Sequence, residues 1–318
     1  MTQEPIRLGT RGSKLALLQA EQVRDRLAAA HPDLAAEGAV RIVEIRTSGD
    51  KVQDRALAEI GDKGLFVKEL EEALLDRRVD VAVHSMKDVP TRLPAGFEIA
   101  ALLESADPRD AFVSPRAARL EDLPEGAVLA SASVRRLAQA LERRPDLGTT
   151  LIRGNVQTRL RKLEEGLADA TFLAMAGLDR LGTPEIATRV LEPEEMMPAV
   201  AQGVIGVEIR EEDARMRDLL APLDHAPTGH RVAAERALLF ALDGSCRTPI
   251  GALAEFEAGG ALRLRALVAR PDGTALWRAE RRGLAADAAA MGLDAGEELR
   301  AAADPACFAD DARSADEG

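Results

Sequence analysis

The chain has 318 residues, of which 46% are hydrophobic and 3% aromatic, and it contains no tyrosine. Its 54 acidic and 42 basic residues give a net charge of -12, which repels nucleic acid and anionic membranes, so neither is an expected partner. The length predicts two or three domains, and a composition rich in Leu, Val, Ile and Ala favours helices packed on buried parallel strands.

Cysteine usage and the N-terminal residues indicate a reduced environment. Cys246 and Cys307 lie far apart and form no CxxC pair, and the four histidines share no metal-ligand spacing with them, so neither a disulfide framework nor a metal site is predicted. The first residues lack the basic and apolar regions of a signal peptide, and no apolar run approaches the ~20 residues that span a bilayer. We therefore expect a cytoplasmic protein.

The first part of the chain alternates short apolar runs with helical patterns, which is typical of βαβ units on a mostly parallel sheet. The predicted elements are a strand at Ile6–Gly9, a helix at Leu15–Ala30 capped by Ser13, a strand at Val40–Arg46, a helix at Leu65–Arg77 and a strand at Val79–His84. The turn-rich stretch Ser105–Pro108 interrupts this pattern.

The alternation then restarts. The predicted elements are strands at Val128–Ala130, Thr150–Ile152 and Thr171–Met175, with helices at Val134–Arg144 and Thr158–Gly166. Breaks follow at Glu192–Pro198 and Pro222–Gly229.

The last part changes character and predicts a small α+β unit. Strand-like runs at Arg263–Ala269 and Thr274–Arg281 flank Pro271-Asp272-Gly273, which is a hairpin signal. An Ala-rich helix is expected around Leu284–Ala303, before an acidic tail.

Charged and hydroxyl residues follow the predicted strands, where ligands of open α/β sheets bind. They are Arg11 and Ser13, Ser85 and Lys87, Ser133 with Arg135 and Arg136, then Arg153, Arg159 and Arg180. Guanidinium groups gathered beside helix N-termini favour anions, so the pattern predicts a ligand with several carboxylates or phosphates. Taken alone, Arg135 and Arg136 are equally compatible with ordinary exposed helix charges.

Two further residues suggest chemistry. Asp88 follows a strand beside Lys87; it is either a salt-bridge or capping residue, or a fixed negative charge held against a cation that develops during reaction. Cys246 lies in a Gly/Ser/Pro loop beside Arg247, where an accessible thiolate is a good nucleophile, although most lone cysteines are inert core residues. Cys307 lacks such a setting.

Standard phosphate and nucleophile motifs are absent from the sequence. There is no GxxxxGK[ST] loop, no GxGxxG fingerprint and no GxSxG elbow. A transferase that uses ATP or another phosphate donor is therefore disfavoured.

Over nearly its whole length the chain resembles the porphobilinogen deaminase family, also called hydroxymethylbilane synthases. The matching stretches are RLGTRGS at 7–13, GDKGLFVKEL at 61–70, AVHSMKDVP at 82–90, DPRDA at 107–111, SVRR at 133–136, RGNVQTRL at 153–160, AGLDRLG at 176–182, QG at 202–203 and the Cys246 loop. The order and spacing of these stretches make the resemblance specific.

The resemblance implies a transferase of tetrapyrrole and heme biosynthesis. Four porphobilinogen molecules are condensed head to tail with loss of ammonia onto a dipyrromethane primer, which is joined by a thioether to Cys246, and water releases the linear tetrapyrrole. The implied fold is two bilobal, doubly wound α/β domains similar to periplasmic binding proteins, with a small α+β C-terminal domain, in a monomer. The expected domains are residues 1–104 with 199–222, residues 105–198, and residues 223–318 carrying the cysteine.

The resemblance also implies residue roles. Asp88 is the expected catalytic residue, and no metal is expected. The expected cofactor-binding residues are Cys246, Lys87, Ser85, Ser133, Arg135 and Arg136; the substrate-binding residues are Arg11, Ser13, Arg153, Arg159, Arg180 and Gln202; Lys63 and Phe66 belong to a mobile lid. Ala132 and Ser245 depart from the family pattern, which puts one carboxylate contact and the loop conformation in doubt.

A competing interpretation is a non-catalytic anion-binding module of the same bilobal fold. It explains the arginines but gives Asp88 and the cysteine loop no role.

Overall fold

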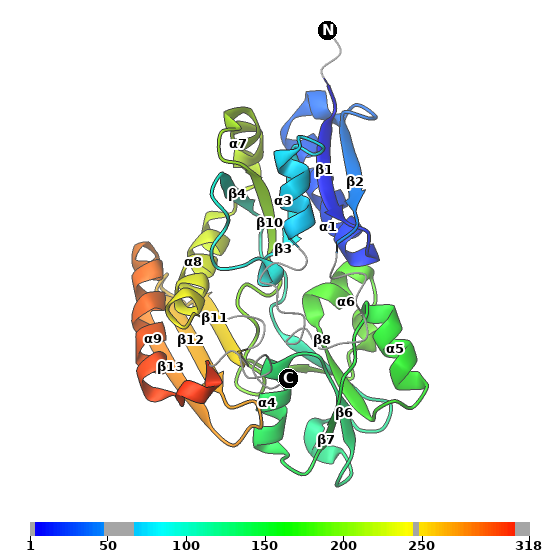
Figure 1. The fold of residues 1–318 in the computed structure, drawn as a ribbon, viewed down its shortest axis with the longest axis vertical. Coiled ribbons are helices and arrows are strands. Elements are labelled where there is room, and N and C mark those ends of the chain that lie inside the picture. The colour runs from blue at the N-terminus through cyan, green and yellow to red at the C-terminus, as the bar shows by residue number, and fades with distance from the viewer. Residues whose placement is uncertain (1–3, 48–66, 244–247, 309–318) are drawn as a thin grey trace, which may run out of the picture.

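The computed structural model describes residues 4–47, 67–243 and 248–308. Within these ranges the strands form two five-stranded sheets and one three-stranded sheet. Figure 1 shows the first sheet in the upper half of the molecule, the second in the lower half, and the third, with two long helices, on the left. The predicted class, two α/β units with a small α+β unit, is confirmed.

The first sheet has the strand order β2-β1-β3-β10-β4. Its strands are β1 (Ile6–Arg11), β2 (Val40–Ile45), β3 (Val81–Ser85), β4 (Phe97–Leu102) and β10 (Ile205–Arg210), and its helices are α1 (Lys14–Ala30), α3 (Lys68–Leu75) and α7 (Ala214–Leu220). Along β3, Val81 and Val83 join the core beneath α1 and α7, whereas Ala82 joins the core beneath α3. This alternation places helices on both faces of the sheet.

The second sheet repeats this plan with the order β7-β6-β8-β5-β9. Its strands are β5 (Asp110–Val113), β6 (Val128–Ala130), β7 (Gly148–Thr150), β8 (Ala170–Ala174) and β9 (Arg189–Leu191), and its helices are α4 (Val134–Arg143), α5 (Val156–Glu164) and α6 (Met175–Leu181). Phe112 and Phe172 pack in one core with their ring centroids 5.9 Å apart, and Ala111 and Leu173 face the other.

Each five-stranded sheet is mostly parallel, as expected, with a single reversed strand: β10 is antiparallel to β3 and β4, and β5 is antiparallel to β8 and β9. The reversed strands are those that the chain enters after crossing from one sheet to the other. The two crossing segments meet where Ala106 N donates to Gly203 O over 3.3 Å. Gly203 has a φ of +90°, and a Cβ there would lie 2.7 Å from Ala106 O, so this contact requires glycine.

The third sheet is antiparallel, with the order β11-β12-β13. Its strands are β11 (Ile250–Phe256), β12 (Leu262–Ala269) and β13 (Leu276–Gly283), covered by α8 (Ala226–Ala241) and α9 (Ala288–Ala302). The predicted turn at Gly273 joins β12 and β13, and a Cβ at this glycine would lie 2.6 Å from Glu142 N. The hairpin turn therefore packs directly against α4.

Several sequence-based bounds were shifted. β7 ends at Thr150, where the predicted strand began, because its pairing with β6 ends at Ala130↔Thr150. α5 begins two residues earlier than predicted, because the side chain of Asn155 accepts a hydrogen bond from Thr158 N and caps it. The predicted helix at Leu65–Arg77 begins at Lys68 in the described part of the chain.

The prediction also missed strands β4, β5, β9, β10 and β11 and helices α6, α7 and α8. β10 illustrates the reason: all six of its residues are buried, including Glu208 and Arg210, so it shows no alternation of polar and apolar residues. Among the described helices, none is long and apolar enough to cross a membrane.

Candidate active site

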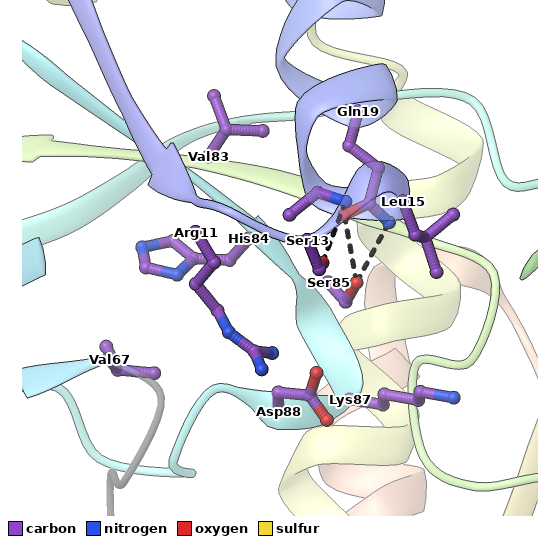
Figure 2. A pocket seen from close by; sticks show the side chains of 11 residues that line it. Arg11, Ser13, Leu15, Gln19, Val67, Val83, His84, Ser85, Lys87 and Asp88 are labelled. Atoms are coloured by element: carbon purple, nitrogen blue, oxygen red, sulfur yellow. Dashed lines mark hydrogen bonds between the residues drawn. The ribbon is translucent and has the colours of Figure 1, made fainter. Parts of the chain in front are cut away.

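A cavity of about 100 Å³ lies at the carboxyl ends of β1 and β3, beside the N-terminus of α1. Its lining residues, shown in Figure 2, are Arg11, Ser13, Leu15, Ala16, Gln19, Val67, Val83, His84, Ser85, Lys87 and Asp88. Five of the predicted site residues, Arg11, Ser13, Ser85, Lys87 and Asp88, are therefore brought together here.

The wall formed by α1 is held by hydroxyl contacts. Ser13 Oγ accepts a hydrogen bond from Ala16 N over 3.3 Å, so this predicted ligand residue also caps α1. Gln19 Nε2 donates to Ser85 Oγ over 2.8 Å and joins α1 to the end of β3. Gln19 was not anticipated from the sequence, since a glutamine within a helix gives no local signal of a site.

Asp88 ends a single helical turn, Met86–Asp88, that directly follows β3. Figure 2 shows its carboxylate directed towards the cavity, with the Arg11 side chain extending towards it from the end of β1. Asp88 is half-buried, whereas the neighbouring Lys87 is exposed. A carboxylate in this position can accept hydrogen bonds from a ligand and oppose a positive charge.

Behind this loop a buried carboxylate, Asp110 on β5, holds two of the predicted arginines. Arg136 donates to Asp110 Oδ1 over 2.7 Å, Arg135 lies 2.8 Å from Oδ2, and Gln202 Nε2 donates to Oδ1 over 2.8 Å. Burial alone would raise the pKa of Asp110, but the charges of Arg135 and Arg136 and the two hydrogen bonds outweigh it and hold that pKa well below its usual range. Sequence reasoning assigned Asp110 no role.

Lys87 connects this cluster to the Asp88 loop. Its Nζ donates to Gln202 Oε1 over 3.4 Å. Although solvent reaches Lys87, the surrounding protein desolvates its ammonium group and, together with the charges of Arg136 and Arg135, lowers its pKa to about 8 against the attraction of Asp88 and Asp110. The charge of Lys87 therefore interacts with Asp88, which follows β3 of the first sheet, and with groups on β5 and α4 of the second α/β unit.

The remaining predicted arginines add positive charge from the second sheet. Burial lowers the pKa of Arg159 to about 10, helped by Arg136 and Arg153 and opposed by Asp88. Burial also lowers the pKa of Arg180 to about 10, and its Nη2 donates to Gly203 O over 2.7 Å. Desolvation is the largest cause of both shifts, so these are buried guanidinium groups with which a bound polyanion could pair.

Other predicted residues have structural partners or lie outside the described ranges. Ser133 caps α4, since its Oγ accepts from Arg136 N over 3.4 Å. Lys63, Phe66 and Cys246 lie outside the described residues. Cys307 is buried, and burial raises the pKa of its thiol, which is the setting of an unreactive cysteine.

A second unanticipated group begins at the cavity wall, where His84 is a lining residue. His84 Nε2 is 2.7 Å from Glu208 Oε2, and both side chains are buried. Glu71 on α3 lies in the field of this pair: burial, and then the Glu208 charge, raises its pKa to about 7. Among the described residues, no group of three or more His, Cys, Asp or Glu side chains could hold a metal ion.

Comparisons with known proteins agree along the chain. A family model described as "Porphobilinogen deaminase, dipyromethane cofactor binding domain" matches residues 6–218, and one described as "Porphobilinogen deaminase, C-terminal domain" matches residues 230–301. The porphobilinogen deaminase of Paracoccus denitrificans is 59% identical over 308 residues, which cover 97% of each chain. The chloroplastic porphobilinogen deaminase of Oryza sativa is 52% identical over 308 residues, covering 95% of this chain and 85% of the relative.

Among solved structures, a periplasmic substrate-binding protein of an ABC transporter from Coxiella burnetii matches 69% of this chain and 91% of its own, with 17% identity and a TM-score of 0.42.

Proposed function

The chain belongs to the porphobilinogen deaminase family, and we propose that it condenses four porphobilinogen molecules head to tail, with Asp88 as the catalytic carboxylate and Cys246 as the attachment point of a dipyrromethane primer. It is accordingly a transferase of tetrapyrrole biosynthesis, and its family model is that of a dipyrromethane-binding domain.

The observation that carries the proposal is the group of cations around Asp88 and the crossing segments. Lys87 and Arg159 interact electrostatically with Asp88 and with Arg136, and Arg180 donates to the crossing segment at Gly203. Porphobilinogen and dipyrromethane bear carboxylates on every pyrrole unit, so such a ligand adds negative charge beside Lys87, Arg159 and Arg180, whereas Asp110 already pairs with Arg135 and Arg136. The donor set therefore fits the primer.

When bound, the dipyrromethane primer supplies the pyrrole carbon to which the first substrate unit is joined. We propose that Lys87, Ser85, Ser133, Arg135 and Arg136 hold its carboxylates. Arg11, Ser13, Arg153, Arg159, Arg180 and Gln202 would hold those of the incoming substrate.

The proposed role of Asp88 follows from the charge change during reaction. Loss of ammonia from porphobilinogen leaves a positive charge on the pyrrole unit, and a fixed carboxylate nearby stabilises that charge. The same oxygens can accept hydrogen bonds from pyrrole N–H groups.

Further parts of the proposal rest on the family motif. Lys63 and Phe66, which lie outside the described residues, would belong to a lid segment. The three sheets would correspond to domains at residues 1–104 with 199–222, residues 105–198 and residues 223–318. We also propose a cytoplasmic monomer.

The test is the intact mass of the purified protein beside that of a Cys246→Ser variant. A wild-type excess of two linked pyrrole units that is absent from the variant would support the primer and its attachment point. A wild-type protein whose mass stays unmodified after incubation with porphobilinogen would contradict the proposal and favour a non-catalytic anion-binding module.

A further inference from the structure

Two adjacent residues of α8, Glu235 and Arg236, hold two different segments of the candidate site. Arg236 Nη1 donates to Val89 O over 3.1 Å, and its Nη2 donates to Pro90 O over 2.5 Å and to Thr91 O over 3.2 Å. These three carbonyls belong to the residues that immediately follow Asp88. The guanidinium group thus binds the backbone that directly follows the Met86–Asp88 turn.

The hydrogen bonds that Arg236 forms in the described part of the chain all go to these three backbone carbonyls. Within the described part of the chain it forms no ion pair, and burial lowers its pKa without any carboxylate to oppose the effect. Burying a charged group against carbonyls without a carboxylate partner costs folding free energy. This cost suggests that Arg236 serves to fix the position of the 89–91 backbone.

The same face of α8 binds this segment at three successive turns. Val232 shares a hydrophobic core with Met86 and Val89, Arg236 binds the carbonyls, and the Arg92 guanidinium lies 4.5 Å above the Phe240 ring. Residues 232, 236 and 240 are four apart and therefore share one face of the helix. The segment that carries Asp88 is consequently laid along α8 rather than free at the end of β3.

Glu235 holds the opposite side of the site. Its Oε2 accepts from Ala201 N over 2.6 Å, and its Oε1 accepts from Ala254 N over 2.8 Å. Ala201 has a φ of +55° and precedes Gln202. The side-chain amide of Gln202 donates a hydrogen bond to Asp110 and accepts one from Lys87. Both ends of the Lys87–Gln202 contact therefore depend on neighbouring residues of one helix.

We infer that Arg236 is a positioning residue for Asp88, holding the Met86–Thr91 segment on α8 so that the carboxylate faces the cavity in a single place. The inference rests on the proposed role of Asp88. Because catalysis depends steeply on the placement of the reacting groups, loss of this grip should slow the reaction more than it weakens substrate binding.

The test compares Arg236→Ala with Arg144→Ala. Arg144 is the control, since it too is half-buried and donates to the carbonyls of Leu120, Leu123 and Pro124, but it also pairs with Asp146 and lies at the C-terminal cap of α4. We expect Arg236→Ala to lower kcat by about 10- to 100-fold with a KM change below about threefold, and added guanidinium ion to restore part of kcat. Amide hydrogen exchange in residues 87–92 should accelerate in this variant and not in the control.

The inference is overturned if kcat stays at the wild-type level in Arg236→Ala, or if both variants lose kcat in proportion to their loss of Tm. An Asp88→Asn variant separates this outcome from failure of the proposed function. An active Asp88→Asn enzyme would refute the role of Asp88 itself. With that variant inactive, a fully active Arg236→Ala enzyme would refute only the positioning role.

Discussion

Arg136 donates a hydrogen bond from its guanidinium group to Oδ1 of Asp110 over 2.7 Å, and Asp110 has no exposed surface. Arg135 lies 2.8 Å from the other carboxylate oxygen. One buried carboxylate on β5 therefore carries two adjacent arginines from the first turn of α4. Their guanidinium groups are held before any ligand arrives, which lowers the entropic cost of binding an anion.

Replacing Asp110 with Asn should destabilise the protein by about 3–5 kcal/mol, because it leaves two buried guanidinium groups without their counter-charge. Urea unfolding measures this difference. The exposed pair of Arg119 and Asp122 is the control, since Asp122→Asn should change the free energy of unfolding very little. Equal small losses in the two variants would show that Asp110 does not anchor the arginines.

Asp88→Asn should lower turnover at least about 100-fold while leaving the unfolding transition in place, because the amide keeps the shape of the side chain but loses the charge that opposes a developing cation. Consumption of porphobilinogen measures turnover, and circular dichroism checks the fold. Asp76→Asn, an exposed residue at the C-terminal cap of α3, should leave turnover unchanged. Near-normal turnover in Asp88→Asn would remove this residue from the chemistry.

The rate at which the apo-protein gains the primer should fall as the pH rises above about 8, because the pKa of Lys87 is about 8 and its deprotonation removes a positive charge from the residues proposed to hold the primer carboxylates. A Lys87→Arg variant keeps its charge over this range and should have a flatter profile. The intact masses of both apo-proteins, followed over time with porphobilinogen between pH 7 and 9.5, would reveal the difference. Identical profiles would mean that another group, including the amine of the substrate, controls the fall.

Gly203→Ala should lower Tm, because a Cβ at this position would lie 2.7 Å from Ala106 O and the φ of +90° disfavours alanine. Gly229→Ala is the control: Gly229 lies within α8, and a Cβ there meets no atom within 4 Å, so alanine should raise stability by about 0.5–1 kcal/mol. Differential scanning calorimetry distinguishes the two. An unchanged Tm in Gly203→Ala would show that the crossing segments separate at little cost.

Glu71 should make the protein less stable as the pH rises from about 4.5 to about 7. Its pKa is raised from 4.5 to about 7 by burial and by Glu208, so the folded state keeps a proton that the unfolded state releases. Urea unfolding of the wild type and of Glu71→Gln at pH 5 and pH 7.5 would isolate this contribution. The stability difference between the two proteins should shift in favour of the variant at the higher pH, and a constant difference would contradict the assignment.

Much of the fold could be predicted because it is local. The strand predicted at Ile6–Gly9 and the Ser13 cap of α1 follow from a short apolar run and from one hydroxyl, and both predictions are confirmed. β10 could not be found in this way, because burial on both faces removes its alternation.

The sequence by itself determined the family, the α/β class and the collection of cations and Asp88 that follow the strands. The tertiary structure alone decided which of these groups are anchored and by what. Asp110 meets Arg136 across 26 positions and Arg236 meets Val89 across 147, and no motif or periodic pattern identifies either pair as partners. The physical reason is that the desolvation and charge compensation that set the pKa values of Lys87 and Asp110 depend on atoms brought close only by folding, whereas a sequence pattern records neighbours along the chain.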